Sequence, residues 1–376
     1  MNSRPTKTLQ KKIEKILNKK FKTVSFFDST TRHTPSSLKN FLLDKFKNYN
    51  NKDHYRSAVV IYAGEVQFYL PYGMVSVDFY NMHKAIKETG LTDLTFVIVS
   101  TWGQSYDLQV KNFLAKKDKE NKYISLYMPV PNQEDFENID WQSHEPKYKF
   151  SYCGHNNILH RQLFSKFLIK HNLHKENIVA FTNREKTFNT PLRKYDNTIE
   201  EDEAFVYAPR NRQDNWINDD EVMKIWDDTA LENIYHPEIP PYDLKTYQPY
   251  QEKAYINIIG ETVFDYPYPR FTEKVFGPIL SKRIFILLAP ADTLKELRDI
   301  GFQTFDDIFS EEYDTVSDPN KRFRIICDLI LKLNELPIDK FEKLHIKADA
   351  IHKHNLLHFK KLSNNIPQDI LQLNNI

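Results

Sequence analysis

Glycine and cysteine are scarce in this sequence. Its 376 residues include 8 glycines and 2 cysteines. We find neither a G-x-G-x-x-G sequence nor a P-loop, so a kinase, a P-loop ATPase and an ordinary dinucleotide-binding protein lose their main support. Cys153 and Cys327 are too few for a disulfide framework or a thiolate zinc site, and we expect both to be reduced and structural.

Long apolar runs and an excess of one charge are also missing. No run approaches the roughly 20 apolar residues that span a bilayer, and the polar, lysine-rich start lacks the apolar centre of a signal peptide. Lys and Arg number 52 against 51 for Asp and Glu, so no overall field attracts nucleic acid. The sequence therefore predicts a soluble, cytoplasmic protein in which any polyanion binding is local.

Apolar residues make up 40% of the chain and aromatic residues 14%, enough to fill two cores. The length exceeds what one hydrophobic core usually supports, so about two domains are expected. The first domain is predicted at residues 1–146. It contains strand-like runs at 22–27, 58–62 and 94–99 and helix-like runs at 36–46 and 79–88. This alternation predicts an α/β fold with a parallel sheet and crossover helices.

A second domain is predicted at residues 147–330, followed by a helical C-terminal segment at 331–376. The expected strands are 148–152, 178–181, 254–259 and 284–288, and the expected helices are 156–171, 272–280 and 291–300. Residues 184–253 interrupt this rhythm with an acidic run and several prolines. We interpret them as an insertion with one helix near 219–228, and we expect helices from Asp318 onward.

Two groups of side chains have a structural and a functional interpretation. Residues 7–22 combine seven lysines with an apolar stripe, which favours the solvated basic face of a packed helix over contact with phosphates or a membrane. His354 and His358 have the spacing of metal ligands, with His345 and His352 nearby. No H-E-x-x-H sequence accompanies them, so we predict solvated or packed histidines and no metal site.

Glu65 follows a predicted strand and Gly64, so its carboxylate should project at the carboxyl end of that strand. A shielded carboxylate there can accept a proton from an acceptor hydroxyl. The alternative is a surface glutamate in a loop.

Arg161 lies near the start of a predicted helix, after the polar residues His155 and Asn156. The amides of a helix start, together with a guanidinium, form an anion site suited to a diphosphate. The alternative is an ordinary surface arginine.

The segment Thr272-Glu273-Lys274 opens another predicted helix. Thr272 is a candidate cap, and Glu273 suits the helix dipole. Lys274 is less expected at the positive end of a helix, and its presence indicates an anionic ligand. Glu273 is also a candidate partner for ribose hydroxyls, whereas the plain alternative for the segment is a capping turn.

Three segments together resemble the α-1,3-fucosyltransferase family, glycosyltransferase family 10. Val60-Ile61-Tyr62-Ala63-Gly64-Glu65, followed by Asp78-Phe79-Tyr80, resembles the Tyr-x-Gly-Glu segment of that family. His155-Asn156-x4-Arg161 is similar to its Ser-Asn-x4-Arg. Glu261 and the later Thr272-Glu273-Lys274 are similar to its Phe-Glu-Asn-Ser and Thr-Glu-Lys segments.

The resemblance implies a GT-B fold, in which two Rossmann-like domains face a cleft, and inverting transfer from a nucleotide sugar without an essential metal or other cofactor. It implies that Glu65 is the base, that Arg161 and Lys274 bind the diphosphate, and that Glu273 binds the ribose. Glu261 would lie near the donor sugar or nucleotide. The donor-binding set also includes His155, Asn156 and Thr272.

The sequence departs from the family where His155 replaces a serine, Val66 an asparagine, and Thr262-Val263 an Asn-Ser pair. GDP-fucose is therefore one candidate donor, and a glycan hydroxyl is the expected acceptor. An alternative is a DNA glycosyltransferase acting on a hydroxylated base, and a second is a non-catalytic protein that binds sugar or nucleic acid. The sequence does not fix the sugar, the nucleotide, the acceptor or the oligomeric state.

Overall fold

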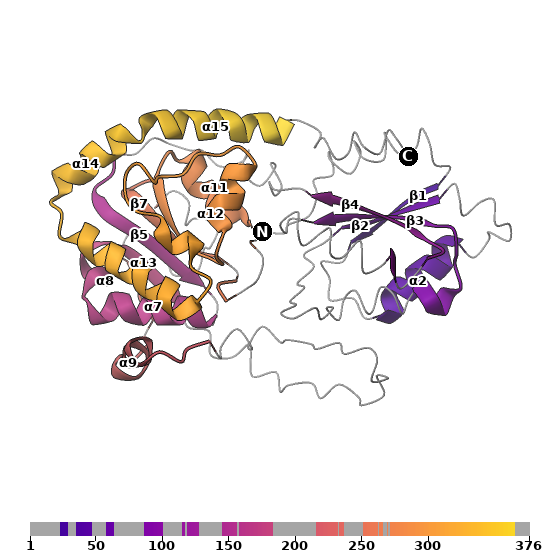
Figure 1. Ribbon diagram of the computed structural model, residues 1–376, viewed down its shortest axis with the longest axis horizontal. Coiled ribbons are helices and arrows are strands. Elements are labelled where there is room, and N and C mark those ends of the chain that lie inside the picture. Colours follow the sequence, from indigo (N-terminus) through magenta and orange to yellow (C-terminus); the bar gives the residue numbers. More distant parts are fainter. Residues whose placement is uncertain are drawn as a thin grey trace. The chain divides into compact units, whose positions relative to one another are not determined.

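The computed structural model divides the chain into two compact units (Figure 1). Unit 1 comprises Met1–Ile139, Asn197–Ala208 and Lys361–Ile376, and unit 2 comprises Asp140–Asp196 and Pro209–Lys360. The structure describes residues 23–28, 35–46, 58–63, 86–100, 115–116, 119–127, 145–155, 158–182, 216–231, 233–236, 251–261, 263–265, 269 and 271–364. The helix expected at 7–22 lies outside these ranges. Of the helix expected at 79–88, residues 86–88 are described, and they are helical.

Unit 1 contains a parallel sheet of four strands in the order β1-β2-β3-β4. The strands are β1 (Thr23–Asp28), β2 (Ala58–Ala63), β3 (Thr95–Ser100) and β4 (Lys122–Tyr127), and α2 (Pro35–Phe46) follows β1. The three predicted strands and the helix at 36–46 are confirmed. Strand β4 was not predicted, because it follows a lysine-rich stretch and Lys122 and Ser125 interrupt its apolar residues.

Unit 2 contains a second parallel sheet, in the order β6-β5-β7-β8. Its strands are β5 (Tyr148–His155), β6 (Ile178–Thr182), β7 (Ala254–Gly260) and β8 (Ile284–Leu288). Both β7 and β8 are buried along their whole length. Continuous burial is typical of parallel strands whose two faces are covered, and it explains why these runs are apolar apart from Asn257 of β7.

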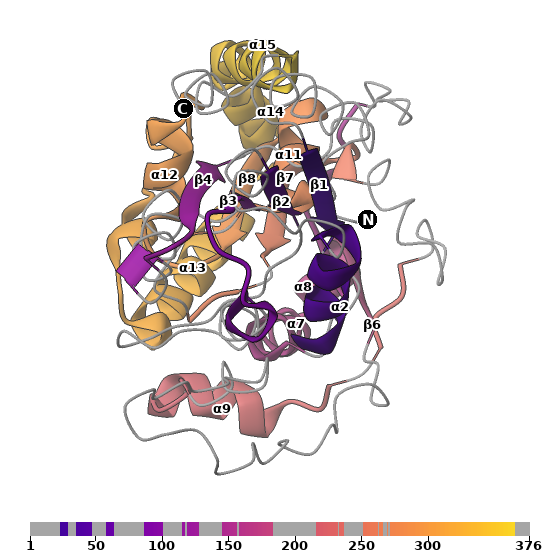
Figure 2. The same ribbon diagram turned by 90° about the vertical axis from the view of Figure 1, so that its right-hand side faces the viewer.

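The helices of unit 2 agree with the predicted positions except for α8, which was not predicted. They are α7 (Leu159–Lys170), α8 (Leu173–Glu176), α9 (Asp220–Asp228), α11 (Glu273–Leu280), α12 (Thr293–Asp299), α13 (Pro319–Asn334), α14 (Ile338–Lys347) and α15 (Asp349–Asn364). Helices α7 and α8 lie on one side of the strands and α11 and α15 on the other, as Figures 1 and 2 show. The helices expected after Asp318 are confirmed, and the side chain of Asp318 caps α13 by accepting from the Lys321 amide at 2.7 Å.

Helix α9, expected within the insertion, packs against α7. The ammonium of Lys166 on α7 lies 4.1 Å from the centre of the Trp226 ring and donates to the Trp226 carbonyl oxygen. Asn320 on α13 donates to the carbonyl oxygen of Trp216 at 2.6 Å. The part of the insertion that the structure describes is therefore attached to two helices of unit 2.

Candidate functional site

The strand order of unit 2 creates a switch point between β5 and β7. From β5 the chain crosses to β6 on one side, whereas from β7, on the other side of β5, it crosses outward to β8. The connections therefore leave two neighbouring strands in opposite directions, and open α/β sheets bind ligands at the carboxyl ends of such strands. Arg161 follows β5, and Glu261 follows β7 directly.

The structure brings Arg161 and Glu261 together. The Nη2 atom of Arg161 donates to the carbonyl oxygen of Glu261 at 2.9 Å, and the Arg161 side chain is 4% exposed. A Cβ atom added at Gly260 would lie 3.2 Å from Cγ of Arg161, so the glycine gives this side chain its room. The alternative of an ordinary surface arginine is wrong.

His160 contacts the same carbonyl oxygen of Glu261. Its Nε2 atom lies 2.9 Å from that oxygen, the side chain is buried, and the ring stacks on Phe264. Burial, followed by the charge of Arg161, holds the pKa of His160 well below its ordinary value, although the Glu261 carbonyl opposes this shift. The imidazole is therefore neutral at pH 7. A carbonyl oxygen can only accept a hydrogen bond, so the single ring proton of the neutral His160 resides on Nε2.

The carboxylate of Glu261 binds Thr272, which lies just before α11. Oε2 accepts from the Thr272 hydroxyl at 2.6 Å, and Oε1 accepts from the Thr272 amide at 3.4 Å. The Glu261 side chain is completely buried. One residue therefore connects α7, through its carbonyl, with the start of α11, through its carboxylate.

Thr272 caps α11, as the sequence predicts. Its Oγ1 atom accepts from the amide of Lys274 at 3.3 Å and from the ammonium of Lys274 at 3.2 Å. Four predicted donor-site residues thus form one connected network at the switch point, and we call Arg161, Glu261, Thr272 and Lys274 the switch-point network.

The remaining predicted residues are placed less completely. Glu65 and Asn156 lie outside the described residues. His155 is the last residue of β5 and Glu273 the first of α11, so both belong to the segments that meet at the switch point. Their side chains are outside the described part of the structure, and their roles stay predictions.

His160 and Gly260 were not among the site residues predicted from the sequence. A signal existed for Gly260, because a glycine that ends an apolar strand in a chain with 8 glycines indicates close approach of another group. No local signal identified His160. Its partner, the Glu261 carbonyl, lies 101 positions along the chain.

A cavity of about 720 Å³ lies elsewhere in unit 2. Its lining includes Lys170 and His174 near the end of α7, and Asp228 and Tyr235 after it. Arg161 lies near the beginning of α7 and Lys170 ends it. The cavity is therefore separate from the switch-point network.

Among the described residues, no group of three or more His, Cys, Asp or Glu residues is arranged to hold a metal ion. His354 and His358 instead bind backbone carbonyls: their Nε2 atoms lie 2.9 Å from the Gly301 oxygen and 2.7 Å from the Ile300 oxygen. His352 is buried. The prediction of solvated or packed histidines is confirmed. In the described part of the chain, no helix combines the length and apolar character needed to cross a membrane.

No protein-family model matches the chain, and no curated protein sequence matches it. The resemblance to the α-1,3-fucosyltransferase family therefore stays a resemblance.

Some solved structures are weakly similar to this chain. A mutant of T4 phage BGT in complex with UDP-glucose is 12% identical over 86% of this chain and 75% of its own, with a TM-score of 0.34. The T4 phage β-glucosyltransferase is 12% identical over 91% of this chain and 100% of its own, with a TM-score of 0.31. A β-glucosyltransferase described as a DNA-modifying enzyme has 11% identity and a TM-score of 0.30. At these scores the similarity assigns neither donor nor acceptor to this chain, whose own architecture is α/β with parallel sheets.

Proposed function

We propose that this protein is an inverting glycosyltransferase of the GT-B class that needs no metal ion. Its donor would be a nucleoside-diphosphate sugar, with GDP-fucose among the candidates, and its acceptor a hydroxyl group of a glycan. The switch-point network supports this proposal most directly, because it gathers Arg161 and Lys274 where an open α/β sheet binds its ligand.

The charges of the network suit a diphosphate leaving group. Lys274 lies in the first turn of α11, where backbone amides also carry partial positive charge. The buried guanidinium of Arg161 adds a second cation close to the carboxyl end of β7. Cations and amides held in advance stabilise charge that develops on a leaving phosphate, and this lowers the barrier to transfer.

The proposed reaction proceeds in one displacement. Glu65 takes the proton of the acceptor hydroxyl while the hydroxyl oxygen attacks the anomeric carbon from the face opposite the diphosphate. The bond from the anomeric carbon to the diphosphate oxygen breaks, and the diphosphate leaves with the electron pair. Lys274, Arg161 and the helix amides balance its charge.

The first experiment measures thermal unfolding with GDP, UDP, ADP or CDP, each with and without magnesium. We expect one diphosphate to raise the melting temperature without magnesium, because a ligand that binds the folded state stabilises it. Lys274→Ala should weaken this binding about tenfold or more, since a charge-assisted contact is lost.

The matched control is Lys295→Ala. Lys295 also lies at the start of a helix of unit 2, α12, but pairs with Asp299 at 2.8 Å outside the network. This variant should bind the nucleotide as the unaltered protein does. No shift with any of the four nucleotides would contradict the proposed function.

A second variant tests the catalytic step. Glu65→Gln should bind the donor nucleotide normally but transfer sugar about 10²–10⁴-fold more slowly, because the amide accepts no proton. Radiolabelled transfer to saccharide acceptors, with duplex DNA carrying hydroxylated bases as a second acceptor, measures the rate. Equal rates for Glu65→Gln and the unaltered protein would contradict the role of Glu65.

A further inference from the structure

The hydroxyl of Thr272 makes three hydrogen bonds, and their geometry fixes its orientation. Its neighbours are the Glu261 carboxylate at 2.6 Å, the Lys274 amide at 3.3 Å and the Lys274 ammonium at 3.2 Å. The amide and the ammonium only donate, so each must meet a lone pair of Oγ1. A hydroxyl has two lone pairs and one proton, and the proton is therefore left for Glu261.

Glu261 is also anchored on its other side. Its carbonyl oxygen accepts from Nε2 of His160 and from Nη2 of Arg161, each at 2.9 Å. Both donors belong to α7. Helix α7 thus fixes the position of Glu261 through its carbonyl oxygen. The carboxylate of Glu261 in turn fixes the Thr272 hydroxyl at the start of α11.

We propose that Glu261 is a positioning residue that holds the ammonium of Lys274 at the start of α11 by orienting the Thr272 hydroxyl. This inference rests on the proposed function, in which Lys274 contacts the donor diphosphate. It assigns Glu261 a different part from the contact with the donor sugar or nucleotide that the family resemblance implies. The side chain is fully buried, and both carboxylate oxygens bind Thr272.

The first test needs no nucleotide. Limiting acylation of lysine amines, followed by peptide mass spectrometry, compares the reactivity of Lys274 in variants, with the exposed Lys343 of α14 as an internal reference. Thr272→Val removes the hydroxyl and should raise the acylation rate of Lys274 about fivefold, since a hydrogen bond worth about 1 kcal/mol is lost. Glu261→Gln should also raise the acylation rate of Lys274, because the new side-chain amide can donate to Oγ1 of Thr272 in competition with the Lys274 ammonium. Thr272→Ser keeps the hydroxyl and should retain the original rate.

The matched control is Thr293→Val. Thr293 is a second buried threonine at a helix start in unit 2, and its hydroxyl donates to the Pro290 carbonyl at 2.6 Å. This variant loses the hydrogen bond of a threonine hydroxyl to a backbone carbonyl outside the network and should leave the reactivity of Lys274 unchanged. Equal reactivity of Lys274 in Thr272→Val and the unaltered protein would overturn the proposal, and so would an equal rise in Thr293→Val.

The second test is a double-mutant cycle on binding of the nucleoside diphosphate, measured by calorimetry. If Glu261 acts through Lys274, Glu261→Gln weakens binding in the unaltered protein but adds less than a twofold change to Lys274→Ala. Independent effects that multiply would mean that Glu261 contacts the donor itself, and would overturn the positioning role. If the unaltered protein binds no nucleoside diphosphate, the proposed function fails, and the acylation experiment alone decides whether Glu261 positions Lys274.

Discussion

Gly260 is the residue that admits the Arg161 side chain to the end of β7. An added Cβ would lie 3.2 Å from Cγ of Arg161, so this buried side chain would have to shift by a few tenths of an ångström. We expect Gly260→Ala to lower the free energy of unfolding by about 1–3 kcal/mol, the usual cost of overpacking. Urea denaturation followed by circular dichroism measures the change.

The same substitution in an Arg161→Ala background provides the control. Without Cγ and the guanidinium there is no atom for the new methyl group to displace, so Gly260→Ala should cost less there than alone. Two contacting residues give such non-additive effects, whereas separated sites add. Additive costs would show that the strain at Gly260 has another source.

The role of a single residue is predictable from the sequence when its hydrogen-bond partner lies nearby along the chain, and not when the partner is far away in the sequence. Thr272 was predicted as a cap, and its bond to the Lys274 amide spans two positions. The burial of Arg161 was not predictable, because its partner Glu261 lies 100 positions away. Local hydrogen bonds leave a sequence pattern, but a contact between two crossover connections does not.

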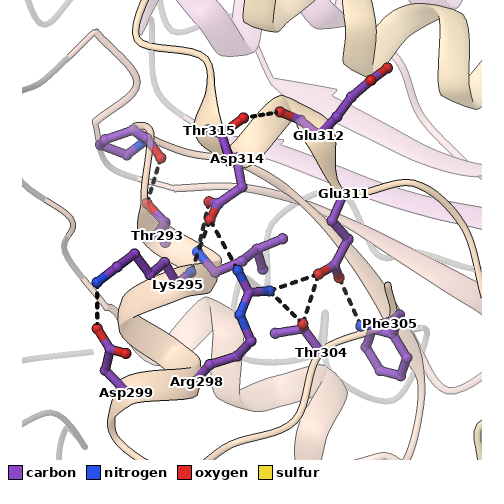
Figure 3. A network of polar contacts seen from close by, with 12 residues as sticks. Thr293, Lys295, Arg298, Asp299, Thr304, Phe305, Glu311, Glu312, Asp314 and Thr315 are labelled. Atoms are coloured by element: carbon purple, nitrogen blue, oxygen red, sulfur yellow. Dashed lines mark hydrogen bonds and ion pairs between the residues drawn. The ribbon is translucent and has the colours of Figure 1, made fainter. Parts of the chain in front are cut away.

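Helix α12 shows the same limit at the scale of an element. The sequence predicts a helix at 291–300, and the structure has Thr293–Asp299. Its N-cap residue, Asp292, makes no capping bond with its side chain. Asp314 does this instead: its carboxylate accepts from the amides of Leu294 at 2.7 Å and Lys295 at 2.9 Å (Figure 3).

The cap is held in turn by Arg298. Its guanidinium lies 3.7 Å from the Asp314 carboxylate and 3.0 Å from that of Glu311, which also accepts from the Thr304 hydroxyl at 2.7 Å (Figure 3). The start of α12 and the segment from Glu311 to Asp314 before α13 therefore stabilise each other. Helix caps are predicted from the residues next to the helix start, so a cap that lies 20 positions away along the chain could not be predicted from the sequence.

Replacement of Asp314 tests this distant cap. Asp314→Ala should lower the free energy of unfolding by about 2–3 kcal/mol, because the buried Leu294 amide and the partly buried Lys295 amide lose their acceptor. Asp314→Asn should cost less, since its carbonyl oxygen still accepts one of them. Chemical denaturation measures both, with Asp339→Ala as the control, whose exposed carboxylate pairs with Lys343 at 3.6 Å. Equal stability of Asp314→Ala and this control would contradict the capping role.

At the scale of the whole molecule, the alternation of strands and helices predicted a parallel sheet in the first domain, and the family resemblance implied a second Rossmann-like domain; the structure has two parallel sheets. The order β6-β5-β7-β8 was beyond the sequence, because each apolar strand of unit 2 is compatible with several neighbours. That order places the connections after β5 and β7 side by side. The candidate site therefore depends on the order of the strands in the sheet, which the apolar pattern of single strands does not specify.

Buried histidines make the stability of unit 2 depend on pH. Burial lowers the pKa of His352 to about 3, helped by the neighbouring His345 and the charge of Arg283 and opposed by Asp349. The pKa values of His160 and His345 are also lowered, in both cases mainly by burial. These rings are neutral in the folded protein, whereas the unfolded chain takes up protons near pH 6.5. Stability is therefore full above about pH 6.5 and is lost as the pH falls toward the folded-state values.

Buried carboxyl groups act in the opposite direction. Burial raises the pKa values of Glu311, Asp314 and Asp265, so the folded protein holds these protons more tightly than the unfolded chain. Acidification through the range above their ordinary values adds stability. A pH profile of the unaltered protein sums both effects, and a variant that removes one imidazole is needed to separate them.

His352→Phe isolates one imidazole. In the described structure Nε2 of His352 is buried without a hydrogen-bond partner, and the ring packs against Phe305 and His345, so a phenyl ring is a close replacement. Between pH 6.5 and 5 the loss of stability should be smaller by up to about 1.4 kcal/mol per pH unit, the contribution of one proton. Urea denaturation at intervals of half a pH unit measures the slope.

The control is His354→Gln on the same helix. It removes a surface imidazole and its bond to the Gly301 carbonyl, and so measures the loss of a histidine without the loss of a buried ring. If the slope is the same in His352→Phe and the unaltered protein, burial of His352 does not cause the acid sensitivity.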